Sequence, residues 1–141
     1  MSPNNFPDNL SMPACTMIPV LEYEDITAAI SWLTDKLGFT ERWRAGSHRA
    51  QLSFGDSAIA ITEANPAKPI AKTNIMIRVK NVAPYYERAQ KHGAEILRPP
   101  SDFPYGERQY TVRDIGGHVW TFSQTIANVV PEEWGGTSAN L

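Results

Sequence analysis

The chain has 141 residues, of which 42% are hydrophobic and 20% are charged, and its formal net charge is −2. These values are typical of one globular domain, and they do not point to nucleic acid or an anionic membrane as a partner. The sequence has no apolar run of about 18 residues and no basic-then-apolar leader, so we expect neither a membrane-spanning helix nor a secretion signal.

The N-terminal residues 1–15 are rich in Asn, Pro and Ser with only scattered apolar side chains. This composition predicts a mobile or loosely packed arm. Cys15 is the single cysteine, so it excludes an internal disulfide and favours a reducing, cytoplasmic location. Its neighbours supply no base, and we therefore interpret it as a structural thiol rather than a catalytic one.

Residues 16–63 are predicted to form a first module with one helix between strands. The three- and four-residue spacing of apolar side chains predicts that the helix covers about Thr27–Leu37. Asp25 or Thr27 can cap its start, and Gly38 supplies the left-handed residue that ends it.

Residues 72–124 are predicted to form a second module, which follows a proline-containing linker at 64–71. It begins with an apolar strand at 74–79 and continues with a helix over about 83–92, which Gly93 ends.

The two modules have the same order of elements, and each closes on an apolar strand after a glycine-bearing turn, at 55–61 and at 116–122. A duplicated unit of about 50 residues predicts an α+β fold with two tandem βαβββ modules that form a curved mixed sheet with a concave cleft. Residues 125–141 follow as a tail, in which Trp134 is expected to dock on its own domain or on a sister subunit.

Strand alternation divides each predicted sheet into two different faces. One face is strongly apolar and suits a covering helix, whereas the other carries small or polar side chains. We interpret the second face as a ligand-sized surface, although it could simply meet water. Aromatic rings and arginines near it could hold a flat or anionic small molecule, and Trp43 could equally pack in the core. The candidate binding residues are Trp43, Arg49, Gln51, Asn74, Met76, Tyr105, Arg108 and Thr121.

Three phrases in the chain carry a family resemblance: Ile18–Asp25, Leu37–Phe39 and, above all, Tyr110–Phe122 with its Asp-x-x-Gly-His turn. Over about residues 16–124 the chain resembles the vicinal oxygen chelate superfamily of glyoxalases, bleomycin resistance proteins and extradiol dioxygenases. The resemblance implies the paired βαβββ fold. It also implies a homodimer, because modules of this family pack within or between subunits to make a cup-shaped cleft.

The metal enzymes of this superfamily place one ligand, usually His or Glu, at each of four strand positions. The resemblance puts Ile18, Ala60, Asn74 and Thr121 at those positions. None of these side chains offers an imidazole or a carboxylate, so a divalent metal site cannot be assembled from them. We therefore expect no metal and no cofactor.

The leading functional expectation is a metal-independent small-molecule-binding protein without catalytic residues, which sequesters an antibiotic or an aromatic metabolite. The alternative is a lyase or isomerase of the same superfamily with an unidentified metal or acid–base site. It would need the Glu22 and Glu24 pair, His118 or Tyr105 to converge on the cleft. We interpret His118 as structural and Asp114 as a turn-closing side chain. A third possibility is a scaffold that serves only assembly.

Overall fold

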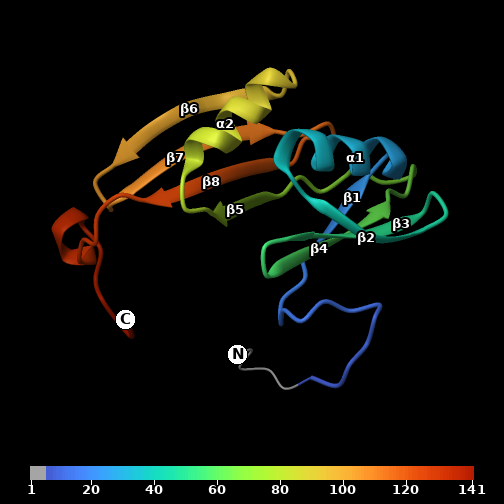
Figure 1. Cartoon of the computed structure of the whole chain (residues 1–141), viewed down its shortest axis with the longest axis horizontal. Helices are drawn as coiled ribbons and strands as arrows, with labels where there is room; N and C mark the ends of the chain where they lie inside the picture. The colour runs from blue at the N-terminus through green and yellow to red at the C-terminus, as the bar shows by residue number, and fades with distance from the viewer. Residues whose placement is uncertain (1–5) are drawn as a thin grey trace. The chain divides into compact units, whose positions relative to one another are not determined.

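A computed structural model of the chain describes residues 6–141 (Figure 1). The chain divides into two compact units, Met1–Thr73 and Asn74–Leu141. Each unit contains a four-stranded mixed sheet and a helix, which confirms the predicted α+β class with two βαβββ modules. The first five residues of the predicted arm lie outside the described residues, and the exact module and linker boundaries stay predictions.

The first unit has the strand order β1-β4-β3-β2, in which β1 and β4 are parallel and the other neighbours are antiparallel. Its elements are β1 (Val20–Tyr23), α1 (Ile26–Trp32), η1 (Leu33–Leu37), β2 (Thr40–Ala45), β3 (Arg49–Phe54) and β4 (Ser57–Glu63).

The helix of the first unit begins and ends where its cap residues predict. The Asp25 side chain accepts a hydrogen bond from the backbone N–H of Ala28, and Gly38 ends the helix in the left-handed region at φ 88°. The last turn, Leu33–Leu37, is a π-helix, because the N–H of Gly38 reaches back five residues to the carbonyl of Leu33.

The second unit repeats this topology with the strand order β5-β8-β7-β6, and again only the β5–β8 pair is parallel. Its elements are β5 (Asn74–Arg78), α2 (Val82–Lys91), β6 (Glu95–Phe103), β7 (Glu107–Arg113), β8 (Val119–Thr125) and η2 (Pro131–Trp134).

Helix α2 has side-chain acceptors at its first turn and the predicted Gly93 after its last turn. The Asn81 side chain accepts from the N–H of Ala83, and the Gln124 side chain on β8 accepts from the N–H of Val82 at 3.0 Å. Gly93 follows the helix with φ 73°. Within residues 6–141, no helix has the length and apolar character that a membrane crossing requires.

Each unit buries the apolar face of its sheet, as the alternation predicts. In the second unit, Tyr110 and Phe122 stack with ring centroids 4.9 Å apart, and Tyr86 of α2 meets Tyr110 edge-on at 5.6 Å. Tyr110 is 0% exposed and is therefore a core residue, and this burial raises the pKa of its hydroxyl. The buried apolar side chains on these faces of the strands are Leu21, Tyr23, Ala50, Leu52, Ile59, Ile61, Tyr110, Val112, Trp120 and Phe122.

The turn between β7 and β8 is organised by Asp114, which is 5% exposed. One carboxylate oxygen accepts from the N–H groups of Gly116 at 2.8 Å and His118 at 2.9 Å. The other accepts from the indole N–H of Trp120 at 2.9 Å. Asp114 thus closes the turn through its side chain, as predicted, and His118 is fully buried beside it.

Candidate functional site

The second face of the first sheet carries small and polar side chains in register. Residues directly opposite one another share a face, so Trp43, Gln51, Ala60 and Val20 form one row across four strands. Figure 1 shows α1 on one side of this sheet and the N-terminal segment on the other. Gln51 and Ala60 are each only 3% exposed, although they lie on the face opposite α1.

A β-bulge brings an additional donor to this face. Glu41 pairs with Leu52 and Trp43 pairs with Gln51, so Arg42 is an extra residue on β2. An Nη1 group of Arg42 donates to the side-chain oxygen of Gln51. Because of the bulge, the consecutive residues Arg42 and Trp43 both reach toward Gln51.

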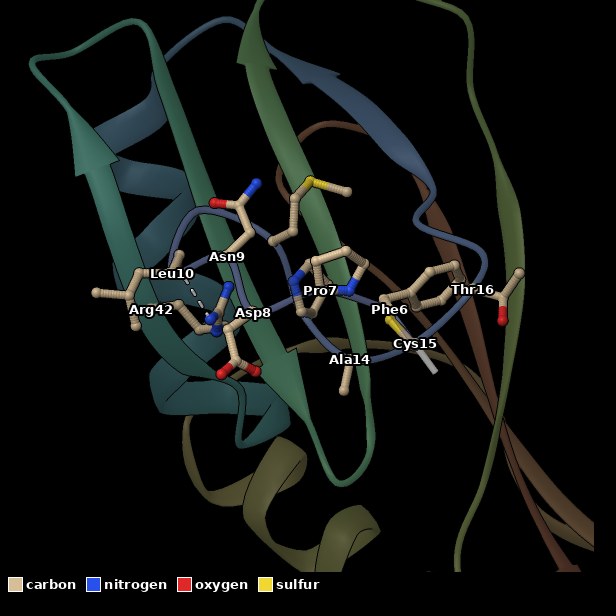
Figure 2. Close-up of a pocket in the computed structure, with 11 residues that line it drawn as sticks. Phe6, Pro7, Asp8, Asn9, Leu10, Ala14, Cys15, Thr16 and Arg42 are labelled. Carbon is tan, nitrogen blue, oxygen red and sulfur yellow. Dashed lines mark hydrogen bonds between the residues drawn. The ribbon is translucent and has the colours of Figure 1, made fainter. Parts of the chain in front are cut away.

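These three side chains bind the N-terminal segment, which we call the arm (residues 6–16). The carbonyl oxygen of Ser11 accepts from Gln51 Nε2 at 3.2 Å and from Trp43 Nε1 at 3.3 Å. The carbonyl oxygen of Leu10 accepts from Arg42 Nη2 at 3.3 Å, a contact drawn in Figure 2. The predicted loosely packed arm is therefore seated on the sheet in this structure.

The arm also encloses a pocket of about 760 Å³ beside Arg42 (Figure 2). Cys15 lies on its wall and is partly buried, without a disulfide partner. The lining residues are Phe6, Pro7, Asp8, Asn9, Leu10, Met12, Pro13, Ala14, Cys15, Thr16 and Arg42.

Arg49 lies one row away from the donor cluster. It pairs with Thr62, which in turn pairs with Glu22, so its side chain is on the same face as Gln51. Arg49 is exposed. The structure therefore places all three predicted residues of the first unit, Trp43, Arg49 and Gln51, on one face.

The second face of the second sheet holds three of the predicted residues. Met76 pairs with Thr121, whose hydroxyl lies 3.2 Å from that of Thr111, and Asn74 lies two residues before Met76 on the same face. Met76 is 59% exposed.

A buried polar group continues this face beyond Thr121. One carboxylate oxygen of Glu107 accepts from Gln109 Nε2 at 2.9 Å and from Ser123 Oγ at 2.5 Å. Gln109 and Ser123 are 8% and 4% exposed, respectively. The face therefore presents a carboxylate whose position is fixed by two neighbouring donors.

The structure does not bring Arg108 onto the same face as Thr121. Arg108 pairs with Gln124, which is three residues after Thr121 on β8. Because side chains alternate along a strand, the side chain of Arg108 points to the other face. Its guanidinium holds Asp102 through two hydrogen bonds of 2.6 and 3.1 Å, which lower the pKa of Asp102. Arg108 is thus engaged in a surface ion pair.

Tyr105 lies in the turn between β6 and β7, within an aromatic cluster. It stacks on Phe103 at 5.3 Å and meets Trp134 edge-on at 5.6 Å. Trp134 thus docks on its own unit, which is one of the two predicted possibilities.

The four positions that correspond to metal ligands hold no suitable donor. Strand β1 begins at Val20, directly after Pro19, which cannot donate to the ladder. Val20 rather than the expected Ile18 therefore lies beside Ala60. Val20, Ala60, Asn74 and Thr121 provide neither imidazole nor carboxylate. Residues 6–141 contain no group of three or more His, Cys, Asp or Glu that could hold a metal ion. These residues do not fit a metal centre.

Two candidates of the acid–base alternative, Tyr105 and His118, lie far apart in the second unit. Tyr105 and His118 lie beyond opposite ends of β7, which has seven residues and spans about 20 Å. His118 is also fully buried in its turn. The two side chains therefore do not converge.

Arg42 and the polar group of Glu107, Gln109 and Ser123 were not predicted as site residues from the sequence. Arg42 was missed because no sequence pattern in this strand predicts the bulge that turns Arg42 toward Gln51. Glu107, Gln109 and Ser123 could have been found, because Gln109 and Ser123 lie opposite each other on the face of Thr121. The alternation of β8 was the available signal.

Comparisons with known proteins identify the family. Residues 19–122 match the model of the glyoxalase/bleomycin resistance protein/dioxygenase superfamily. The chain has no significant match among curated protein sequences.

Solved structures share the fold at low identity. TioX from Micromonospora sp. ML1 is 29% identical, with a TM-score of 0.72 over 79% of this chain and 98% of its own. The bleomycin-binding protein from bleomycin-producing Streptomyces verticillus, complexed with copper(II)-bleomycin, is 22% identical, with a TM-score of 0.62 over 78% and 95%. Lactoylglutathione lyase from Agrobacterium tumefaciens is 15% identical, with a TM-score of 0.65 over 79% and 94%. The chain belongs to the glyoxalase/bleomycin resistance protein/dioxygenase superfamily, also called the vicinal oxygen chelate superfamily.

Proposed function

We propose that this chain binds a small organic molecule without the help of a metal ion. The observation that carries the proposal is the donor cluster of Arg42, Trp43 and Gln51 on the face of the first sheet opposite α1. Convergent donors beside an aromatic ring and small residues are typical of sites for small molecules.

Each part of this face has a role that suits ligand binding. Trp43 offers a flat apolar ring together with an N–H donor, and Arg42 offers a planar guanidinium that can stack or donate. Ala58 and Ala60 on β4 are small and lie beside Gln51, so the floor of the face leaves space for a ligand. Arg49 can add a charge contact from the neighbouring row.

In the second unit we propose Asn74, Met76 and Thr121 as ligand-binding residues. An exposed methionine adapts its shape to different apolar surfaces. The Glu107 carboxylate adds an acceptor on the same face, so this unit suits a ligand that has donor groups as well as apolar surface.

The proposed biological role is sequestration of an antibiotic or an aromatic metabolite by a homodimer of this chain. A bleomycin-binding protein of the same fold supports this class of ligand. Sequestration requires no catalytic residue, because a binding protein lowers the free concentration of its ligand by mass action alone.

The test is calorimetric titration of the chain with a panel of planar antibiotics and aromatic metabolites that includes bleomycin. We expect saturable binding of one panel member and no chemical change in it by mass spectrometry. Gln51→Ala and Trp43→Phe should each weaken binding about tenfold, since each removes one hydrogen-bond donor. Arg44→Ala is the matched control, because Arg44 is exposed and bonded to Glu41.

The result that would contradict the proposal is an absence of binding at millimolar concentration across the panel. Turnover of a bound compound would instead favour the lyase or isomerase alternative. Sedimentation analysis of the same samples tests the homodimer.

A further inference from the structure

We propose that the arm is a built-in competitor for the site on the first sheet, and that this site takes peptide-like ligands. The ligand class is a molecule with two consecutive amide carbonyls that a turn presents on the same side. The inference rests on the proposed function, because it names the ligand class of that same face.

The donors recognise backbone rather than side chains. Gln51 and Trp43 converge on the carbonyl of Ser11, and Arg42 bonds the carbonyl of the preceding residue, Leu10. The Leu10 side chain is 94% exposed and contributes almost nothing to this contact. Three donors therefore bind two consecutive amide carbonyls, a pattern that a peptide-like chain supplies where it turns.

The buried amide of Gln51 requires a partner that supplies a carbonyl oxygen. It is 3% exposed, and its amide both accepts from Arg42 and donates to the arm. A buried amide donor without an acceptor is costly, so a ligand that displaces the arm must present an equivalent carbonyl oxygen. A purely apolar ligand would leave this donor unsatisfied.

The arm is held in a way that permits exchange. Its hydrogen bonds to the sheet measure 3.2 to 3.3 Å, which is longer than the usual value of about 2.9 to 3.0 Å. Its apolar side chains add little burial, since Phe6 is 54% exposed and Met12 is 48% exposed. At Leu10 and Ser11 the arm is therefore attached by weak polar contacts rather than by a hydrophobic core.

Asn9 is the positioning residue of the arm. Its side-chain oxygen accepts from the N–H of Ser11 at 3.1 Å and from the Ser11 hydroxyl at 2.8 Å. The N–H of Met12 also bonds the Asn9 carbonyl at 3.0 Å, which closes a tight turn. This turn points the carbonyls of Leu10 and Ser11 toward the sheet.

Competition of this kind lowers the apparent affinity for any ligand. If the donors are free in only a fraction of the chains, the apparent dissociation constant rises by the inverse of that fraction. Loosening the arm without touching the donors should therefore strengthen binding.

The test uses the full chain and a capped synthetic peptide of residues 6–16 that carries Cys15→Ser. Asn9→Ala removes the turn that presents the arm but leaves all three donors in place. Asn65→Ala is the matched control, because the Asn65 side chain closes a similar turn with the N–H of Ala67 in the linker. We expect Asn9→Ala to bind the peptide about tenfold more tightly than the unmodified chain, and Asn65→Ala to match the unmodified chain. In NMR spectra of Asn9→Ala, the amide signals of residues 10–12 should move toward random-coil positions.

Donor variants complete the experiment. In the Asn9→Ala background, Gln51→Ala or Trp43→Phe should weaken peptide binding at least tenfold, whereas Arg44→Ala should not change it. Weaker binding by Asn9→Ala than by the unmodified chain would overturn the inference, because the arm would then be a wall of the pocket rather than a competitor. So would arm signals that do not move, or a released arm with no peptide binding.

The same samples separate this inference from the proposed function. If a compound of the aromatic panel binds and the peptide does not, the proposed function holds and the peptide-like ligand class is wrong. If neither binds, both are wrong.

Discussion

Replacing Asp114 should destabilise the second unit more than any other substitution of an aspartate in the chain. Its carboxylate accepts three hydrogen bonds of 2.8 to 2.9 Å, and two of the donors belong to His118 and Trp120, which are 0% and 1% exposed. A buried donor that loses its acceptor costs about 1–3 kcal/mol, so Asp114→Ala should cost about 2–6 kcal/mol. That is a large part of the about 5–15 kcal/mol by which a typical domain is stable.

Asp114→Asn is the sharper variant of this experiment. It keeps an oxygen for the backbone N–H groups of Gly116 and His118, but it sets an amide N–H₂ against the indole N–H of Trp120. We expect a loss of about 1–3 kcal/mol in urea unfolding, and a double-mutant cycle with Trp120→Phe should show a coupling above about 0.5 kcal/mol. The exposed turn residue Asp56 is the matched control, and Asp56→Asn should stay within about 0.5 kcal/mol. Zero coupling with a loss no larger than that of Asp56→Asn would refute the reasoning.

Two further predictions concern a glycine turn and an ion pair. Gly55 and Gly106 both have a left-handed backbone, and Gly55→Ala should lower the free energy of unfolding by about 1–2 kcal/mol, because the space at Gly55 is open. Gly106→Ala should lower it by clearly more, because the new Cβ would collide with the carbonyl of Ala127. Equal urea midpoints of the two variants would contradict this. The hydrogen bond from Arg108 lowers the pKa of Asp102, so Arg108→Ala should raise that pKa toward 3.8 in an NMR titration. Because the folded-state pKa is the lower one, the pair's stabilisation is complete above pH 3.8 and is lost as the pH falls through the folded-state pKa. An unchanged Asp102 titration would show that the pair does not form in solution.

The fold was predictable because its signals are local and repeated. Asp25 and Gly38 bound the first helix in the structure as their chemistry predicts. The alternation around Trp120 and Phe122 correctly placed these rings in the core and Thr121 on the opposite face. Because the same order of elements occurs twice in the sequence, four strands were predicted in each unit, as the structure has them.

The site was less predictable because it depends on contacts between distant residues. The bulge at Arg42 is set by pairing with β3, and no pattern within β2 reveals it. The arm has no periodic pattern of apolar residues. The hydrogen bond between Gln51 and Ser11, which are 40 positions apart, could therefore not be predicted from the sequence. Strand β1 begins at Val20, directly after Pro19, whereas the family resemblance placed Ile18 beside Ala60.

The central claim is that this member of the superfamily binds its ligand without a metal ion. Its most direct test is calorimetry of the purified chain, after treatment with a chelator, with Ni²⁺, Mn²⁺, Zn²⁺ and Fe²⁺ in turn. The positions beside Ala60 and Thr121 lack imidazole and carboxylate donors, so we predict no stoichiometric uptake of any of these ions and unchanged ligand affinity in the chelator. Tight uptake of one ion per chain, or ligand binding that the chelator abolishes, would contradict the account and make a metalloenzyme the better description.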